Sequence, residues 1–169
     1  MKKGGTGGSN TKTGLDFEEK TNLEDLLKKI EGIKIFEENV YYNHKKIAEI
    51  YQKYKLYNIL CKKLNINWKK KISARLLPDE CYYKIKEKNL IIIEKKFQSG
   101  GGSVEEKLQT CDFKKKQYEK LFENKDIKVD FWYVLNKWYK NDRFKDVHNY
   151  IEKSGCEYFF HSIPLDKLL

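Results

Sequence analysis

The sequence predicts an α/β protein with a mixed central sheet flanked by helices. Two strand-like runs, 81–86 and 90–97, are separated by a short polar turn and are typical of a hairpin. A helical pattern opens after them at Val104, and a second strong strand covers 127–135. The resulting order is strand, strand, helix, strand. With 169 residues the chain is long enough for one domain with a sizeable core.

The glycine-rich stretch 1–14 is expected to be a flexible arm, and residues 15–169 are expected to form the single domain. The arm lacks the G-x-x-x-x-G-K-[ST] pattern of phosphate loops, and no strand precedes it, so we expect no nucleotide cofactor. Lys12 and the backbone N–H groups of the arm offer contacts to DNA phosphates. Disorder without a role is the alternative.

Apolar spacing predicts two helices before the hairpin. The first spans about 15–30 and is stopped at Gly32, and a short strand follows over 33–36. The second covers 39–65, with Ile47 and Ile50 at the start of its apolar side.

Capping residues and helix-ending glycines predict the elements after the hairpin. Ser103 and Glu106 form a capping box for the helix that opens at Val104. A helix over 143–153 ends before Gly155, and a last strand covers 156–160.

The charge balance indicates a polyanionic partner. There are 35 Lys and Arg against 25 Asp and Glu, a net charge of +10, which suits nucleic acid first and an anionic membrane second. No apolar stretch is long enough to span a bilayer, so no membrane insertion is expected. The four cysteines lack zinc-site spacing and are expected to be reduced, buried thiols of a cytoplasmic protein.

The end of the apolar strand carries the residues with chemical potential. Glu94 and Lys96 are two apart in a strand and therefore share a side, and an antiparallel return brings Asp79 close to Glu94. Carboxylate oxygens suit Mg²⁺, while a lysine can orient a water and offset transition-state charge. In the alternative interpretation, Asp79 caps a turn after Pro78, and Glu94 and Lys96 form an ion pair on a strand edge.

Pro78-Asp79, followed after fourteen residues by Glu94-Lys95-Lys96, resembles the PD-(D/E)XK motif of the restriction-endonuclease-like nuclease superfamily. The resemblance implies an α-β-β-β-α-β core, Asp79 and Glu94 as ligands of Mg²⁺ (with Mn²⁺ as a substitute), and Lys96 as the catalytic lysine. Gln98 extends the match to the E-x-K-x-Q variant, which adds Gln98 to the site.

Two further stretches carry the resemblance. The segment Thr-Gly-Leu-Asp-Phe-Glu-Glu resembles the first helix of many such nucleases, which implies that Glu18 faces the metal; alternatively, Glu18 only favours a helix N-terminus electrostatically. The stretch 94–110 resembles that of small type II restriction endonucleases, where the following helix backs the site. Lys107 and Gln109 are therefore candidates for phosphate contacts.

A basic run precedes the hairpin. Lys69, Lys70 and Lys71 follow Trp68 and are candidates for contacts to a DNA backbone, with a solvated charge run as the alternative. Arg75 stands just before the hairpin and is a candidate for contact with the scissile phosphate or a base.

Taken together, these patterns predict a Mg²⁺-dependent endonuclease of double-stranded DNA, of the sequence-specific type II restriction class. Cleavage of both strands of a palindrome requires two sites, so a homodimer is expected. A branched-DNA resolvase or repair nuclease on the same core is the first alternative. A non-catalytic basic module that binds nucleic acid is the second.

Overall fold

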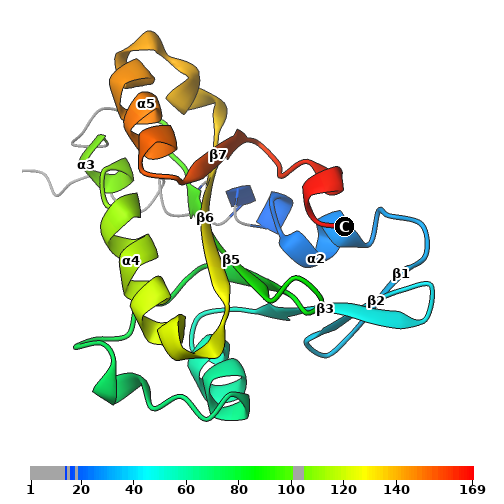
Figure 1. Cartoon of the computed structure of the whole chain (residues 1–169). Coiled ribbons are helices and arrows are strands. Elements are labelled where there is room, and N and C mark those ends of the chain that lie inside the picture. Colours follow the sequence, from blue (N-terminus) through cyan, green and yellow to red (C-terminus); the bar gives the residue numbers. More distant parts are fainter. Residues whose placement is uncertain (1–13, 15, 18, 101–104) are drawn as a thin grey trace, which may run out of the picture.

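In the computed structural model, residues 14, 16–17, 19–100 and 105–169 are described (Figure 1). Their centre is a seven-stranded sheet in which the strands lie in the order in which they occur along the chain. The strands are β1 (Ile33–Phe36), β2 (Asn39–Tyr42), β3 (Lys45–Tyr51), β4 (Glu80–Lys84), β5 (Asn89–Lys96), β6 (Lys128–Leu135) and β7 (Glu157–Phe160).

The sheet is mixed, and β5 is the strand at which its direction changes. Strands β1 to β5 pair antiparallel in sequence, whereas β6 and β7 run parallel to β5. The described helices are α2 (Leu23–Leu27), a π-helix (Leu56–Cys61), α3 (Glu105–Leu108), α4 (Cys111–Phe122) and α5 (Lys145–Lys153). Single 3-10 turns cover Trp68–Lys70, Glu123–Lys125, Lys137–Lys140, Asp142–Phe144 and Leu165–Lys167. The α/β class is therefore confirmed.

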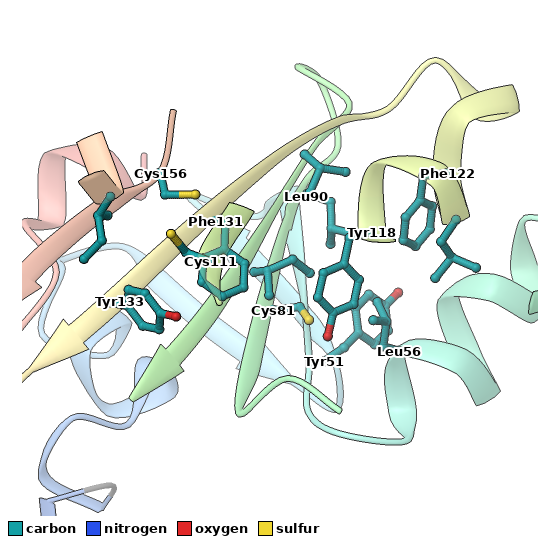
Figure 2. Packing of buried hydrophobic residues seen from close by; sticks show 14 of the residues in the cluster. Tyr51, Leu56, Cys81, Leu90, Cys111, Tyr118, Phe122, Phe131, Tyr133 and Cys156 are labelled. Carbon is teal, nitrogen blue, oxygen red and sulfur yellow. The ribbon is translucent and has the colours of Figure 1, made fainter. Parts of the chain in front are cut away.

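Strand β5 is buried on both faces, as its run of apolar residues predicts. Leu90 and Ile92 pack into the larger core with α4, whereas Ile91 and Ile93 pack into the smaller core with α2. Helices α4 and α2 accordingly lie on opposite sides of the sheet (Figure 1). Figure 2 shows the larger core. All four cysteines are free and buried.

The single helix expected over 15–30 is wrong in its extent. Thr21 and Asn22 interrupt the helical conformation, and α2 covers only Leu23–Leu27. The side chain of Asn22 accepts a hydrogen bond from the Asp25 N–H at 3.2 Å, so Asn22 is the N-cap of a new helix.

The helix expected over 39–65 is also wrong. Strands β2 and β3 occupy most of its first half, joined at Asn43 and His44, which both have positive φ (47° and 68°). Two consecutive residues with positive φ are the requirement of a tight hairpin turn between twisted strands. Ile47 and Ile50, three residues apart, lie on a strand, and helical structure begins only after Tyr51.

The second half of the chain follows the expected order. The hairpin is β4 and β5, the helix after it is mainly α4, and β6, α5 and β7 lie within two residues of their predicted bounds. The flexible arm predicted over 1–14 falls outside the described residues except at Gly14 and stays a prediction. No helix in the described part of the chain is long and apolar enough to cross a membrane.

Candidate active site

Asp79 and Glu94 come together where the hairpin of β4 and β5 begins and ends. Glu80 pairs with Ile93 in the antiparallel register, so the next position places Asp79 opposite Glu94. The backbone N–H of Lys95 donates to Asp79 Oδ2 at 2.8 Å, which fixes this carboxylate against β5. The paired ladder ends at Glu80 and Ile93, and Asp79 immediately precedes it.

Two ammonium groups hold the Glu94 carboxylate on the α4 face of the sheet. Lys96 Nζ lies 2.8 Å from Glu94 Oε2, and Lys114 Nζ lies 2.7 and 2.6 Å from the two carboxylate oxygens. Glu94 is only 5% exposed, and burial alone would raise its pKa. Lys96 and Lys114 outweigh burial and hold the pKa of Glu94 below its ordinary value. Glu94 is therefore a charged group at neutral pH.

Lys114 is the residue of this cluster that sequence reasoning missed. It lies on α4, one turn after Cys111 and one turn before Tyr118, both of which are buried in the larger core. A lysine at an apolar position of a helical repeat is the signal that would have identified it. The pair Lys96 and Lys114 approaches Glu94 from a strand and a helix respectively.

A second buried ion pair lies on the opposite face of the sheet. Lys95 Nζ is 2.9 Å from Glu80 Oε2, and both side chains are almost fully buried. Glu80 also accepts from the Leu23 N–H at 3.1 Å and from Gln52 Nε2 at 3.4 Å. Burial raises the pKa of Glu80, although Lys95 opposes the shift. This pair joins α2 to β4 and β5, next to Asp79 and Glu94.

Two cavities open at the end of the hairpin where Asp79 and Glu94 lie. The larger, of about 460 Å³, is lined by Lys96 and Lys114 together with Gly14, Phe17, Lys95, Phe97, Lys107, Thr110 and Tyr139. Four of the described lining residues are lysines and none of them is acidic, so this part of the cavity suits an anion. The smaller, of about 190 Å³, includes Asp79, Glu80 and Lys95. The cavity beside Lys96 and Lys114 is thus cationic, whereas the lining of the cavity beside Asp79 includes both carboxylates and lysines.

Gln98, Lys107 and Gln109 follow β5. The Gln98 amide donates to the Gly100 carbonyl at 2.7 Å, and its backbone is held by Asn136 through bonds of 2.8 and 3.3 Å. These hydrogen bonds hold the chain after β5, and the proposed role of Gln98 in the site stays a prediction. Lys107 is exposed and lines the larger cavity, and Gln109 is exposed beside it.

The basic run lies away from Glu94, on the connection between β3 and β4. Lys69 and Lys70 are exposed, whereas Lys71 forms an ion pair with Glu123 at 2.6 Å. The guanidinium of Arg75 lies 5.0 Å from the ring of Trp68. Lys12 and Glu18 lie outside the described residues, so their proposed contacts stay predictions.

Two carboxylates are the metal-binding groups that this arrangement offers. Within the described ranges, no group of three His, Cys, Asp or Glu residues is arranged to hold a metal ion. Mg²⁺ is commonly held by one or two protein carboxylates, with waters and substrate phosphates as the remaining ligands. Asp79 and Glu94 fit that donor set.

Comparisons with protein-family models, with curated proteins and with solved structures found no match to this chain.

Proposed function

We propose that this chain is a Mg²⁺-dependent endonuclease that hydrolyses double-stranded DNA with a PD-(D/E)XK-type site. The observation that carries the proposal is the register that sets Asp79 opposite Glu94, with Lys96 on the same carboxylate. An ion pair on a strand edge does not require a second carboxylate at the same point. The Asp79 carboxylate held beside Glu94 therefore favours a functional cluster.

The order of the elements supports the same proposal. Strands β3, β4 and β5 form an antiparallel meander, α4 follows, and β6 returns parallel to β5. When β1 and β2, which lie between α2 and β3, are set aside, this order resembles the helix, three strands, helix, strand order expected of a restriction-endonuclease-like core. The hairpin of β1 and β2 then adds to one edge of that core and β7 to the other.

Asp79 and Glu94 would hold the Mg²⁺, and Mn²⁺ would substitute. When bound, the ion would polarise a phosphoryl oxygen and lower the pKa of a water. Lys96 and Lys114 pair with Glu94, and their charge would compete with a cation for that carboxylate. Both ammonium groups also line the larger cavity, where they could bind phosphate oxygens and offset transition-state charge.

A plasmid digestion with and without Mg²⁺ tests the proposal. The parent is expected to cut, and Glu94→Gln and Asp79→Asn are expected to lose cleavage while still binding DNA. Glu119→Gln is the matched control, since Glu119 is exposed on α4 with only a loose 3.8 Å contact to Lys115. Cleavage by both site variants at the parental rate would exclude this site.

The products distinguish the related functions. Discrete fragments from linear duplex indicate a sequence-specific restriction enzyme, for which light scattering should detect a homodimer. Preferential cutting of four-way junctions indicates a resolvase or repair nuclease.

A non-catalytic basic module that binds nucleic acid is the second candidate. It is favoured by the double neutralisation of Glu94, which on this interpretation is a structural ion-pair cluster. It predicts salt-sensitive DNA binding with no Mg²⁺-dependent cleavage by the parent on linear or branched substrates.

A further inference from the structure

The net positive charge of the chain is concentrated between β3 and β4. Residues 52–78, here called the basic segment, contain eight of the 35 Lys and Arg residues and none of the 25 Asp and Glu residues. The remaining 142 residues carry 27 basic against 25 acidic residues and are close to neutral. The basic segment runs past the end of α4 and occupies the lower part of Figure 1. A polyanion is therefore attracted mainly to this part of the molecule.

Three of the eight cations are already neutralised by acidic residues elsewhere. Lys55 pairs with Glu38, Lys63 with Glu49 and Lys71 with Glu123, at 2.6 to 2.9 Å. The other five are exposed and form no ion pair among the described residues. These are Lys53, Lys62, Lys69, Lys70 and Arg75. They are the charges that remain for a ligand.

Arg75 is held in place by three aromatic rings. Its guanidinium carbon lies 4.8 Å from the ring of Tyr54, 5.0 Å from that of Trp68 and 5.9 Å from that of Tyr57. These cation–π contacts occupy no hydrogen-bond donor, so the N–H groups of the guanidinium stay available for a ligand. No carboxylate in the described part of the chain pairs with it. An exposed arginine with a fixed orientation is prepared for bidentate binding of a phosphate.

The backbone next to Arg75 is tied to the body of the protein. The Leu76 carbonyl accepts hydrogen bonds from the hydroxyls of Tyr57 at 2.7 Å and Tyr118 at 3.0 Å. The Pro78 carbonyl accepts from the Lys53 N–H at 2.9 Å. These bonds fix the short connection from Arg75 to Asp79. A ligand held by Arg75 is thereby kept at a set distance from the proposed site.

We propose that the basic segment is the docking surface for the sugar–phosphate backbone of nucleic acid, with Arg75 as a preorganised phosphate fork. The inference rests on the proposed function for the identity of the polyanion, but the binding does not require hydrolysis. An anionic membrane fits less well, because surface binding to lipid needs an apolar face to insert. The exposed large apolar side chains of the segment are Leu77 and Tyr54, and Arg75 covers the ring of Tyr54.

The test measures the affinity of the protein for a labelled DNA duplex in EDTA. Fluorescence anisotropy gives the binding constant at each of a series of KCl concentrations. Lys69→Ala/Lys70→Ala is compared with Lys34→Ala/Lys86→Ala, which removes the same charge from exposed sites outside the segment. Each lost phosphate contact lowers the slope of log K against log salt by about 0.9. The segment variant is expected to lose nearly two such contacts, and the control none.

Two changes at Arg75 test the fork itself. Arg75→Ala is expected to weaken duplex binding about tenfold, and Arg75→Lys nearly as much, since lysine keeps the charge but lacks the planar fork. The emission of Trp68, which contacts Arg75, should also change on binding, and this change should be lost in Trp68→Phe. Circular dichroism verifies that each variant is folded.

Equal loss of the salt slope in both double variants would overturn the proposal, as would parental affinity of Arg75→Lys. The protein could instead sediment with phosphatidylserine vesicles and lose this binding in Lys69→Ala/Lys70→Ala. That result would identify a membrane as the partner and would also overturn the proposal. Failure of the proposed function is distinguishable. A parent that binds duplex through this segment but never cuts DNA refutes the nuclease, whereas a parent that cuts while segment variants bind normally refutes only the docking surface.

Discussion

The buried pair of Lys95 and Glu80 allows a stability prediction whose size follows from the structure. Replacing Lys95 by Met keeps most of the side-chain volume and removes the ammonium group 2.9 Å from Glu80. The Glu80 carboxylate is 2% exposed and cannot recover the lost partner from water. Removing one partner of a buried pair typically costs about 3–5 kcal/mol, because the remaining charge is left uncompensated.

The lower end of that range applies here. The Leu23 N–H and the Gln52 side-chain amide still donate to Glu80 after the substitution. We therefore expect Lys95→Met to lower the free energy of unfolding by about 3 kcal/mol, and Tm by about 6–12 °C for a domain of this size. The double variant Glu80→Gln/Lys95→Met removes the orphaned charge and should recover most of the loss.

Urea denaturation followed by tryptophan fluorescence measures both variants at neutral pH. The same measurement at lower pH tests independently whether the uncompensated charge of Glu80 causes the loss of stability. Burial raises the pKa of Glu80, so its stabilising contribution is present below its ordinary pKa of 4.5 and is lost as pH rises through the raised folded value. Without Lys95 the folded pKa should rise further. The difference between Lys95→Met and the parent should therefore shrink as pH falls. A loss below 1 kcal/mol at neutral pH, or a loss independent of pH, would refute the reasoning.

Three further predictions concern Lys114, Glu94 and the two tyrosines that bind the Leu76 carbonyl. Lys114→Met should reduce single-turnover cleavage about a hundredfold, as loss of one charge-stabilising donor does, while metal-free duplex binding changes little; parental cleavage would contradict a role for Lys114. The pKa of Glu94 is lowered by Lys96 and Lys114 against the effect of burial, so its stabilisation is present above the ordinary pKa of 4.5 and is lost as pH falls through the lower folded value. The difference in unfolding free energy between the parent and Glu94→Gln should accordingly narrow in acid, and urea titrations giving a constant difference would count against this. Tyr57→Phe and Tyr118→Phe should each lower the free energy of unfolding by about 1 kcal/mol. The double variant should lower it by more than the sum, because the Leu76 carbonyl then accepts from neither hydroxyl. Strictly additive losses in urea denaturation would show that the carbonyl finds another donor.

The parts of the fold that the sequence predicts are those where a single periodicity dominates. The run Leu90–Ile93 is apolar at every position, which is typical of a strand covered on both faces, and both faces are covered. The β2–β3 hairpin was missed because Ile47 and Ile50 are three residues apart, as in a helix. Asn43 and His44 were the available signal, since Asn readily adopts positive φ in a turn.

Some residues of the candidate site are likewise predictable from the sequence, and others require the folded structure. Asp79, Glu94 and Lys96 are predictable because one hairpin and strand alternation relate them. The helical repeat singles out Lys114, but its contact with Glu94 is predictable only once α4 is placed against β5, because 20 residues separate the two. The pairing of Glu80 with Lys95 requires the register of the two strands, which depends on the length and conformation of the turn between them.

The sheet has consequences for how the molecule forms, because each strand neighbours the one before it in sequence. No strand must be inserted between two others that have already paired. The sheet can therefore grow outward from β1 one strand at a time while the polypeptide is being synthesised. Asp79 immediately precedes β4 and Glu94 lies on β5, so their carboxylates can meet before the C-terminal third of the chain has left the ribosome.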